Sequence, residues 1–300
     1  MLHWSEFSNF ARVLANRPQA ALREHDFWSL YERRTEPSGR ADLLCVLMTY
    51  NRPDAFREVL RALHATLGDE PAFVLVLNDK SASDYTEARA EAQRLFGPRL
   101  LWLDARERLG KPGFWKAYQV AFMVARTQQP THALFLQDDL AFEPDMLARV
   151  RTLWSRTASD PKRRVLYLFS SDEDERLGRW VLVPRREVDA ELRLTQWFDL
   201  QAFYVDRAFF ELLDYRMIPI HDNRWRRTPR HSSAVGKHLT LRSFGRANIY
   251  QTYPPLVLHG GVASEMNPLT RAKRSLDNRS LAKAPRVDTS HSGSGSGSRD

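Results

Sequence analysis

The sequence has few of the features that mark secreted, membrane-spanning or disulfide-bonded proteins. Its single cysteine, Cys45, excludes an internal disulfide, and its place in an apolar run suits a small core side chain better than a nucleophile. No apolar stretch approaches the roughly 20 residues of a membrane span. Residues 1–7 have neither the basic flank nor the apolar core of a signal peptide. We therefore expect a soluble, intracellular protein.

What the chain does have is enough apolar sequence for a large core, and an excess of positive charge. Its 300 residues are 43% hydrophobic, which suits one large domain or one and a half. The 45 Lys and Arg residues outnumber the 37 Asp and Glu residues, so the formal net charge is +8. This charge suggests a polyanionic partner, such as nucleic acid, an acidic membrane surface or a phosphorylated substrate.

Strand and helix patterns alternate through the first half of the chain. Residues 1–40 mix aromatic residues with arginine, and we expect a helical lead-in followed by a linker. We then expect strands near 43–48, 73–77, 100–103 and 132–137, with helices near 53–67, 85–95 and 114–126. Such repeated units predict an α/β fold with a mostly parallel sheet flanked by helices.

The fourth strand is the stretch around which the chain is organised, because its apolar run ends in Asp138 and Asp139. A continuous apolar run is typical of a strand covered on both faces, and parallel sheets bind ligands beyond the carboxyl ends of their strands. Neighbouring side chains of an extended chain point to opposite sides, so one carboxylate would bind a cation and the other would support it. The alternative is that the two acids belong to a solvated turn.

Polar residues also follow the first three strands and are predicted to meet in one crevice with the acids. They are Thr49, Tyr50, Asn51 and Arg52 after the first strand, Asn78 and Asp79 after the second, and Gly110 and Lys111 after the third. Asp79 could accept hydrogen bonds from a base or ribose, and Lys111 could bind a phosphate. Taken singly, each of these residue types also occurs in ordinary loops.

The order of these four loops resembles the nucleotide-sugar-binding half of the GT-A glycosyltransferases, particularly the large inverting family. Thr49-Tyr-Asn-Arg-Pro53 looks like its first nucleotide loop, and Asn78-Asp-Lys-Ser81 looks like its Asp-Asp-Gly-Ser segment. Gly110-Lys111 is similar to its Gly-Lys element, and Gln137-Asp138-Asp139 is similar to its metal-binding DXD motif. The resemblance covers about residues 42–267. It implies a nucleotide-sugar-binding half over 41–145 and an acceptor-binding half over 146–270. The composition of residues 271–300 predicts a basic, Ser/Gly-rich flexible tail.

The resemblance also implies a divalent cation, Mn²⁺ or Mg²⁺, that bridges the two phosphates of a nucleotide sugar, which we expect to be a UDP-sugar. Gln137 departs from the acidic first position of DXD, which leaves Asp139 as the expected metal ligand, with Asp138 beside the nucleotide. A strand is expected to end at His259, and a Leu-Val-x-His segment like this one returns to the site in many relatives, so His259 is the second expected ligand. An imidazole ligand would favour manganese over magnesium.

The catalytic base is expected to be a carboxylate of the acceptor half that removes the proton of the acceptor hydroxyl. Residues 197–207 resemble the family's acceptor-side element. Asp222 is preferred because it follows this element as the family's base does, and Asp199 and Asp172 are the substitutes. Asp172 belongs to an acidic cluster, and such charge runs are usually solvated loops. Inversion at the anomeric carbon is implied by the family alone.

Two acceptors remain open from the sequence. Arg224, Arg226, Arg227 and Arg230 surround Trp225, a composition suited to phosphates and bases, although it also fits an exposed basic loop. The pattern from Tyr250 to Pro268 is similar to that of phage-encoded transferases, which favours a hydroxymethylated pyrimidine in duplex DNA, flipped out of its stack. A cell-surface polysaccharide or glycolipid is the alternative. The expected place is the cytoplasm of a bacterium or a phage-infected host.

Two other functional classes compete with glycosyl transfer. A nucleotidyltransferase that acts on sugar phosphates needs a Gly-rich phosphate loop after its first strand, where this chain has Thr49-Tyr-Asn-Arg-Pro53. A non-catalytic nucleic-acid or glycan-binding protein would explain the charge, but it gives no reason for two acids at the end of a strand.

Overall fold

Four parallel strands form the centre of the fold in this computed structural model. The structure describes residues 24–33, 39–169, 186–195, 200–220 and 235–259. The central strands are β2 (Leu43–Thr49), β3 (Ala72–Asn78), β4 (Leu100–Ala105) and β5 (His132–Gln137). They lie in the order β4-β3-β2-β5, and every residue of β2 and β3 is buried. Continuous apolar sequence is what a strand covered on both faces requires.

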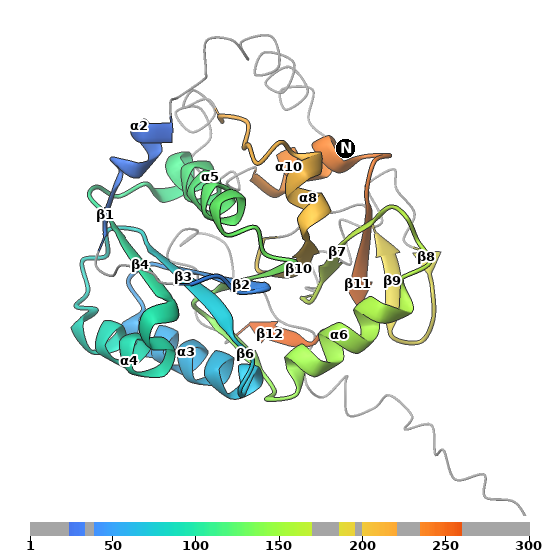
Figure 1. Ribbon diagram of the computed structural model, residues 1–300, viewed down its shortest axis with the longest axis horizontal. Helices are drawn as coiled ribbons and strands as arrows, with labels where there is room; N and C mark the ends of the chain where they lie inside the picture. The colour runs from blue at the N-terminus through green and yellow to red at the C-terminus, as the bar shows by residue number, and fades with distance from the viewer. Residues whose placement is uncertain (1–23, 34–38, 170–185, 196–199, 221–234, 260–300) are drawn as a thin grey trace, which may run out of the picture.

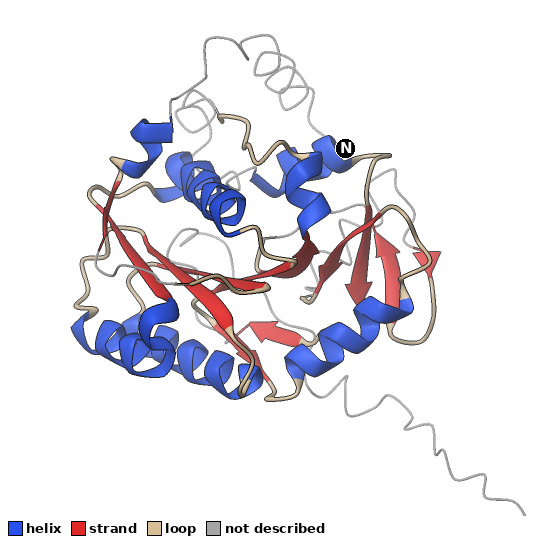
Figure 2. Ribbon diagram, viewed as in Figure 1, coloured by secondary structure: helices blue, strands red, loops and turns tan. Residues whose placement is uncertain are grey.

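Helices cover both faces of this sheet (Figures 1 and 2). One face carries α3 (Pro53–Leu67), α4 (Thr86–Phe96) and α6 (Met146–Arg156), with the short η1 (Gly97–Arg99) after α4. The other carries α2 (Glu24–Trp28), α5 (Gly110–Gln128), α8 (Arg207–Leu212) and α10 (Val235–Ser243). Helix α3 begins at a proline, whose fixed φ suits the first turn, and its buried residues recur at helical spacing.

The second half of the chain extends the same sheet with strands of both directions. Its strands are β7 (Arg163–Tyr167), β8 (Arg186–Glu187), β9 (Leu192–Thr195), β10 (Ala202–Asp206) and β11 (Asn248–Thr252). Strand β10 pairs antiparallel with both β5 and β7, and β11 runs parallel to β7. A separate two-stranded sheet joins β6 (Leu140–Phe142) to β12 (Val257–His259). The predicted α/β class, a mostly parallel sheet flanked by helices, is confirmed, and its parallel part carries the site.

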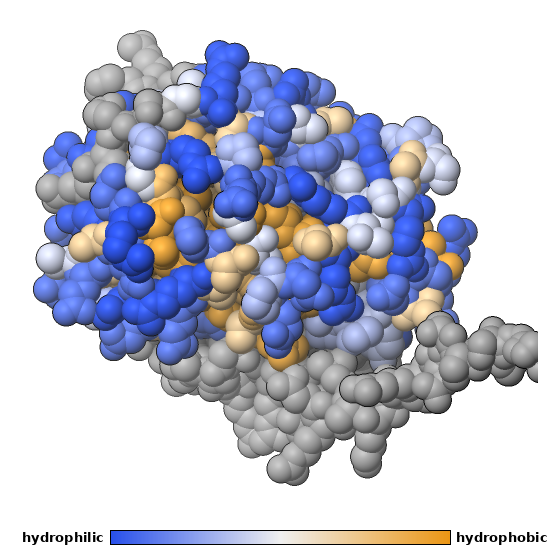
Figure 3. Space-filling model, turned by 60° about the horizontal axis from the view of Figure 1, so that its bottom comes forward, coloured by the Kyte–Doolittle hydropathy of each residue, from blue (hydrophilic) through white to orange (hydrophobic). Residues whose placement is uncertain are grey.

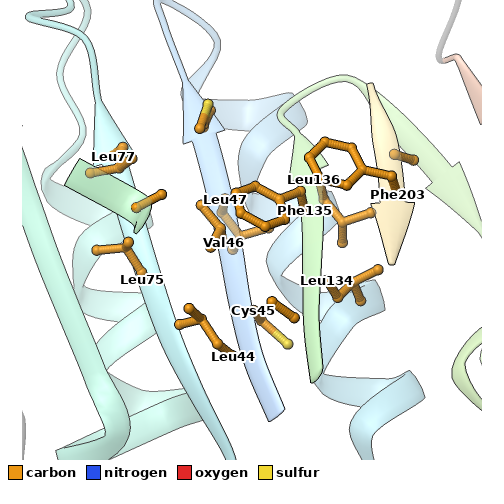
Figure 4. Close-up of a cluster of buried hydrophobic side chains, with 14 of the residues drawn as sticks. Leu44, Cys45, Val46, Leu47, Leu75, Leu77, Leu134, Phe135, Leu136 and Phe203 are labelled. Atoms are coloured by element: carbon orange, nitrogen blue, oxygen red, sulfur yellow. The ribbon is translucent and has the colours of Figure 1, made fainter. Parts of the chain in front are cut away.

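The core lies on both sides of the central strands, and Figure 4 shows part of it. Side chains of β2, β3 and β5 pack there with Phe203 of β10. The rings of Phe135 and Phe203 stack with their centroids 4.5 Å apart, and both side chains are buried. Cys45 is also fully buried among these residues, as its apolar surroundings in the sequence predict.

Three local predictions differ from the structure. Helix α5 begins at Gly110 and not near Phe114, so the Gly-Lys pair lies in its first turn. The predicted lead-in contains a strand, β1 (Tyr31–Arg33), which pairs antiparallel with β4 at the sheet edge. The single strand predicted to end at His259 is two strands, β11 and β12, which belong to different sheets. The turn between them contains a cis peptide bond before Pro254.

Within the described ranges, no helix is long and apolar enough to cross a lipid bilayer. The face drawn in Figure 3 is mostly hydrophilic, with hydrophobic residues gathered near its centre.

Candidate active site

The loop after β2 is fixed by the carboxylate of Asp138. The Thr49 hydroxyl donates to Asp138 Oδ2 over 3.0 Å, and the backbone N–H of Tyr50 donates to the same oxygen over 2.8 Å. Because the Thr49 proton is used in this way, the hydroxyl of Tyr85, 2.6 Å away, must donate to Thr49. Tyr85 in turn accepts from the backbone N–H of Arg52 over 2.9 Å. A buried chain of hydrogen bonds therefore runs from the first loop to the acid pair.

The two acids lie in a turn between β5 and β6, not in an extended strand as predicted. The turn is nevertheless not solvated, because Asp138 and Asp139 are 8% and 7% exposed. Burial, followed by the charge of the adjacent Asp139, raises the pKa of Asp138 to about 6. Neither reading of the sequence, an alternating strand or a solvated turn, describes this arrangement. Both carboxylates face one pocket.

Arg52 supplies the positive charge beside these acids. Its guanidinium forms an ion pair with Asp139, and its Nη1 lies 3.9 Å from Oδ1 of Asp138. The side chains of Arg52 and Asp139 are only 9% and 6% exposed. A buried pair of this kind is held in place strongly, because removing one member leaves the other charged and desolvated.

Asp79 also lines the site, and it accepts hydrogen bonds at the start of α5. Its two carboxylate oxygens accept hydrogen bonds from the backbone N–H groups of Leu109, over 2.6 Å, and Gly110, over 2.9 Å. Burial raises the pKa of Asp79, although these two hydrogen bonds and the charge of Arg108 act in the opposite direction. Gly110 has a φ of +53°, a conformation that glycine adopts without strain. The backbone of Leu109 and Gly110 thus holds Asp79.

Other predicted residues brace the loops. Asn78 donates from Nδ2 to Asp104 over 2.8 Å, and its Oδ1 accepts from the hydroxyl of Ser81 over 2.7 Å. Asn51 donates its backbone N–H to Oγ of Ser81 over 2.9 Å, which joins the loops after β2 and β3. Burial lowers the pKa of Lys111 in the first turn of α5.

A pocket with about 620 Å³ of space, part of it open to solvent, lies at the carboxyl ends of these strands. Its polar wall consists of Thr49, Tyr50, Arg52, Asp79, Gln137, Asp138 and Asp139, and its apolar wall consists of Tyr31, Met48, Leu77, Leu109, Phe114 and Ala117. Six of the predicted residues therefore lie together on this pocket. Four others, Asn51, Asn78, Gly110 and Lys111, are not among the described residues that line it.

Several site residues were missed from the sequence. Tyr31 reaches the pocket from β1, and only the mixture of aromatic and arginine residues in the lead-in marked that segment. Tyr85 was read as the start of a helix, yet its hydroxyl links two loops. Arg108 places its guanidinium 4.6 Å from the ring centroid of Tyr50, a cation–π contact that no local pattern reveals.

The acceptor-side predictions mostly lie outside the described residues. These are the base candidates Asp222, Asp199 and Asp172, and the arginines Arg224, Arg226, Arg227 and Arg230. The backbone of His259 is described, and it pairs with Leu140, the residue that follows Asp139. The side chain of His259 is not described.

The residues of this pocket fit a divalent cation. Among the described side chains there is no group of three or more acids, histidines or cysteines that could enclose a metal ion. Two adjacent buried carboxylates do suit a Mg²⁺ or Mn²⁺ ion that also takes oxygens from a substrate diphosphate and water. Since Arg52 pairs with Asp139, such an ion must share that carboxylate with the guanidinium or displace it.

No protein-family model matches the chain, and no curated protein matches it. Among solved structures, the mannosyltransferase PcManGT from Pyrobaculum calidifontis, in complex with GDP-Man and Mn²⁺, is 19% identical with a TM-score of 0.41. That alignment covers 69% of this chain and 55% of PcManGT.

Two further structures are similar to the same degree. S. aureus TarS 1-349 in complex with UDP-GlcNAc is 15% identical, with a TM-score of 0.45 and coverage of 70% and 57% of the two chains. Glucosyl-3-phosphoglycerate synthase from Mycobacterium tuberculosis, with Mg²⁺ and UDP, is 16% identical, with a TM-score of 0.41 and coverage of 71% and 69%. This chain thus spans little more than half of PcManGT and of this TarS fragment. At these identities and scores the likeness assigns no activity to the chain.

Proposed function

We propose that this protein is a metal-dependent glycosyltransferase that moves a sugar from a nucleotide sugar to a hydroxyl acceptor. The observation that carries the proposal is the pocket in which two buried carboxylates, Arg52 and Asp79 meet at the carboxyl ends of parallel strands. Ligands of open α/β sheets bind at this edge. The loop sequences around the pocket are those that resemble the GT-A enzymes.

The pocket offers groups suited to both parts of a nucleoside diphosphate. Met48, Leu77 and Phe114 give it an apolar wall on which a base can pack, and Asp79 can accept hydrogen bonds from the nucleoside. Arg52 also lines the pocket, and its planar guanidinium can bind phosphate oxygens with two hydrogen bonds. We propose a UDP-sugar as the donor.

The acids would hold the cation, with Asp139 as its ligand and Asp138 fixing the adjoining loop. When bound, a divalent ion supplies positive charge to the diphosphate as it leaves. His259 is proposed as a further ligand, which is supported by the pairing of its backbone with Leu140 beside the acid pair. Manganese is preferred for that reason.

For the proton of the acceptor hydroxyl, we propose Asp222 as the base, with Asp199 and Asp172 as the alternatives. The bond from the acceptor oxygen to the anomeric carbon forms as the bond to the diphosphate oxygen breaks. The proton passes to the carboxylate, so charge and atoms balance. A single displacement of this kind gives inversion, as the resemblance implies.

For the acceptor, we propose a hydroxymethylated pyrimidine in duplex DNA of a phage-infected bacterial cytoplasm. The formal charge of +8 and the arginines at 224, 226, 227 and 230 support a polyanionic acceptor. A surface polysaccharide or glycolipid is the second candidate.

The proposal is tested with a panel of UDP- and GDP-sugars, each incubated with the protein in Mn²⁺ or in a chelator. We expect slow release of nucleoside diphosphate that requires Mn²⁺. Neither a nucleotidyltransferase nor a binding protein would give this result. Duplex DNA with hydroxymethylated pyrimidines should then accept sugar, with the unmodified duplex as its control. Transfer to a surface glycan in place of DNA would refute the DNA acceptor alone. Absence of both donor cleavage and nucleotide binding would refute the transferase.

Binding to duplex DNA should fall by about 10²-fold between about 50 and 200 mM salt, because the four arginines displace counterions. The double variant Arg226→Ala, Arg227→Ala should bind more weakly and show a shallower salt dependence. Binding that does not depend on salt would contradict the proposed role of these arginines.

A further inference from the structure

Gln137 occupies the position where the resemblance leads one to expect an acid, and its contacts give it another role. It is the last residue of β5 and lines the pocket beside Asp138. Its side-chain Nε2 donates a hydrogen bond to the backbone carbonyl of Leu200 over 3.2 Å. Its backbone N–H donates to the carbonyl of Gln201, also over 3.2 Å. Gln137 therefore holds two consecutive residues of the acceptor half.

The same carbonyl of Leu200 accepts a second side-chain hydrogen bond. The donor is the hydroxyl of Tyr118 in α5, 3.2 Å away. The ring of Tyr118 is 1% exposed and stacks on Phe135 with centroids 5.8 Å apart. Leu200 is itself buried. Two rigid elements, β5 and α5, thus converge on one carbonyl oxygen and use both of its lone pairs.

The chemistry of this contact excludes the acid expected from the family. A carboxylate can only accept hydrogen bonds when ionised, so aspartate or glutamate at position 137 would direct an oxygen at the oxygen of Leu200. An amide both faces the pocket and donates to a carbonyl. The glutamine is therefore explained by what it holds.

What it holds is the entry to β10. Residues 200 and 201 lead directly into Ala202, which pairs with Leu136 of β5. Strand β10 also pairs with β7, and the chain continues from β10 into α8. The Leu200 carbonyl thus lies where the acceptor half enters the strand that pairs with β5 beside the pocket.

We propose that Gln137 is a positioning residue that fixes the Leu200–Gln201 segment against the donor pocket. It does so together with Tyr118, and it takes no part in holding the cation. The structural part of the proposal stands on the hydrogen bonds alone, whereas its consequence for sugar transfer rests on the proposed function. A displaced acceptor half would lower the rate of transfer without weakening the binding of the nucleotide.

The test uses Gln137→Glu, which keeps the shape of the side chain and removes the donor, and Tyr118→Phe, which removes the second donor. The matched control is Gln119→Glu in the same helix. Gln119 is also buried and donates from Nε2 to a carbonyl, that of Tyr215 over 3.1 Å, but it does not line the pocket. Hydrogen exchange is followed by mass spectrometry in peptides that cover residues 200–206.

We expect exchange over residues 200–206 to become at least about tenfold faster in Gln137→Glu and in Tyr118→Phe, but not in Gln119→Glu. Exchange that stays at the wild-type rate in both pocket variants would overturn the proposal. This readout requires no activity, so it separates the proposal from the proposed function.

Kinetics supply the second readout. The kcat for transfer should fall about 10- to 100-fold in Gln137→Glu, because the acceptor is misplaced. The dissociation constant of UDP in Mn²⁺ should stay within about threefold of wild type, since the nucleotide contacts are kept. If Gln137→Asp instead binds Mn²⁺ more than about tenfold tighter with wild-type exchange, the position is a vacant ligand site, and the positioning role is wrong.

Discussion

Two clusters of carboxylates and arginines in this protein show opposite electrostatics. We call Arg52, Asp138 and Asp139 the site cluster, and Arg57, Arg61 and Glu91 the helix cluster, which joins α3 to α4. In the site cluster the effect of burial exceeds that of the hydrogen bonds and of Arg52, and the pKa of Asp138 rises to about 6. In the helix cluster the hydrogen bonds from Arg61 and Arg57 outweigh the effect of burial, and the pKa of Glu91 falls to about 2.

The two pKa shifts differ because each carboxylate faces a different number of arginines, and because those arginines differ in their exposure to solvent. Glu91 receives hydrogen bonds from Arg57 and Arg61, whose side chains are 28% and 54% exposed and so keep much of their hydration. In the site cluster one buried arginine serves two adjacent acids. The helix cluster is built to stabilise, whereas the site cluster keeps negative charge that a further cation could neutralise.

The largest effect is expected from Arg52→Met. It leaves two buried carboxylates without their cation and should lower the free energy of unfolding by about 3 kcal/mol or more at neutral pH. Millimolar Mn²⁺ should restore much of this loss, because a bound ion would replace the missing charge. Urea unfolding with and without Mn²⁺ measures both.

The matched control for that variant is Arg57→Met in the helix cluster. Loss of its partly exposed ion pairs should lower the free energy of unfolding far less than Arg52→Met does, because Glu91 keeps its pair with Arg61, and Mn²⁺ should restore nothing. An equal response of both variants to Mn²⁺ would remove the distinction between the clusters.

The next effect concerns pH and the helix cluster. Glu91→Gln should lose about 1 to 3 kcal/mol at pH 7, because two arginines lose a charged acceptor. A depressed pKa stabilises the folded state above the ordinary pKa of glutamate, and this stability is lost as pH falls towards 2. The gap between wild type and variant should therefore shrink from pH 7 to pH 3 in urea unfolding. A gap that does not change with pH would show that the contact is one of packing.

A smaller effect is expected from Gly113→Ala. A Cβ there would lie 2.7 Å from Cβ of Leu109, whose N–H binds Asp79. The free energy of unfolding should fall by about 1 to 2 kcal/mol, and the affinity for UDP should fall because Asp79 shifts. Gly68→Ala is the control. A Cβ at position 68 would contact no neighbouring atom, whereas the φ of +54° is unfavourable for alanine. The control should lose stability and keep its affinity for UDP; a loss of affinity in both variants would indicate a global effect.

The parts of the fold that local sequence encodes were predictable. Helix α3 has the predicted bounds, Pro53–Leu67, because a proline begins it and its apolar residues recur at helical spacing. Strands β2 to β5 were visible as continuous apolar runs. The gathering of the polar loops followed from parallel topology, which brings the carboxyl ends of strands to one edge.

The parts that could not be predicted depend on contacts between distant segments. Arg52 and Asp139 are 87 residues apart, and neither shows its partner in the sequence. Strand β1 has three residues, too few for a periodic pattern, yet it brings Tyr31 to the pocket. The departure at Gln137 was visible, but its reason is a carbonyl 63 residues further along the chain.

The most direct test of the account is the binding of UDP measured by titration calorimetry in Mn²⁺ and in a chelator. We compare wild type with Asp139→Ala and with the control Asp145→Ala, an exposed aspartate near the start of α6. We expect wild type and Asp145→Ala to bind UDP only in Mn²⁺. Asp139→Ala should lose about 100-fold or more in affinity, because the charge of the UDP diphosphate is left uncompensated. Binding that is independent of metal and equal in all three proteins would contradict the central claim.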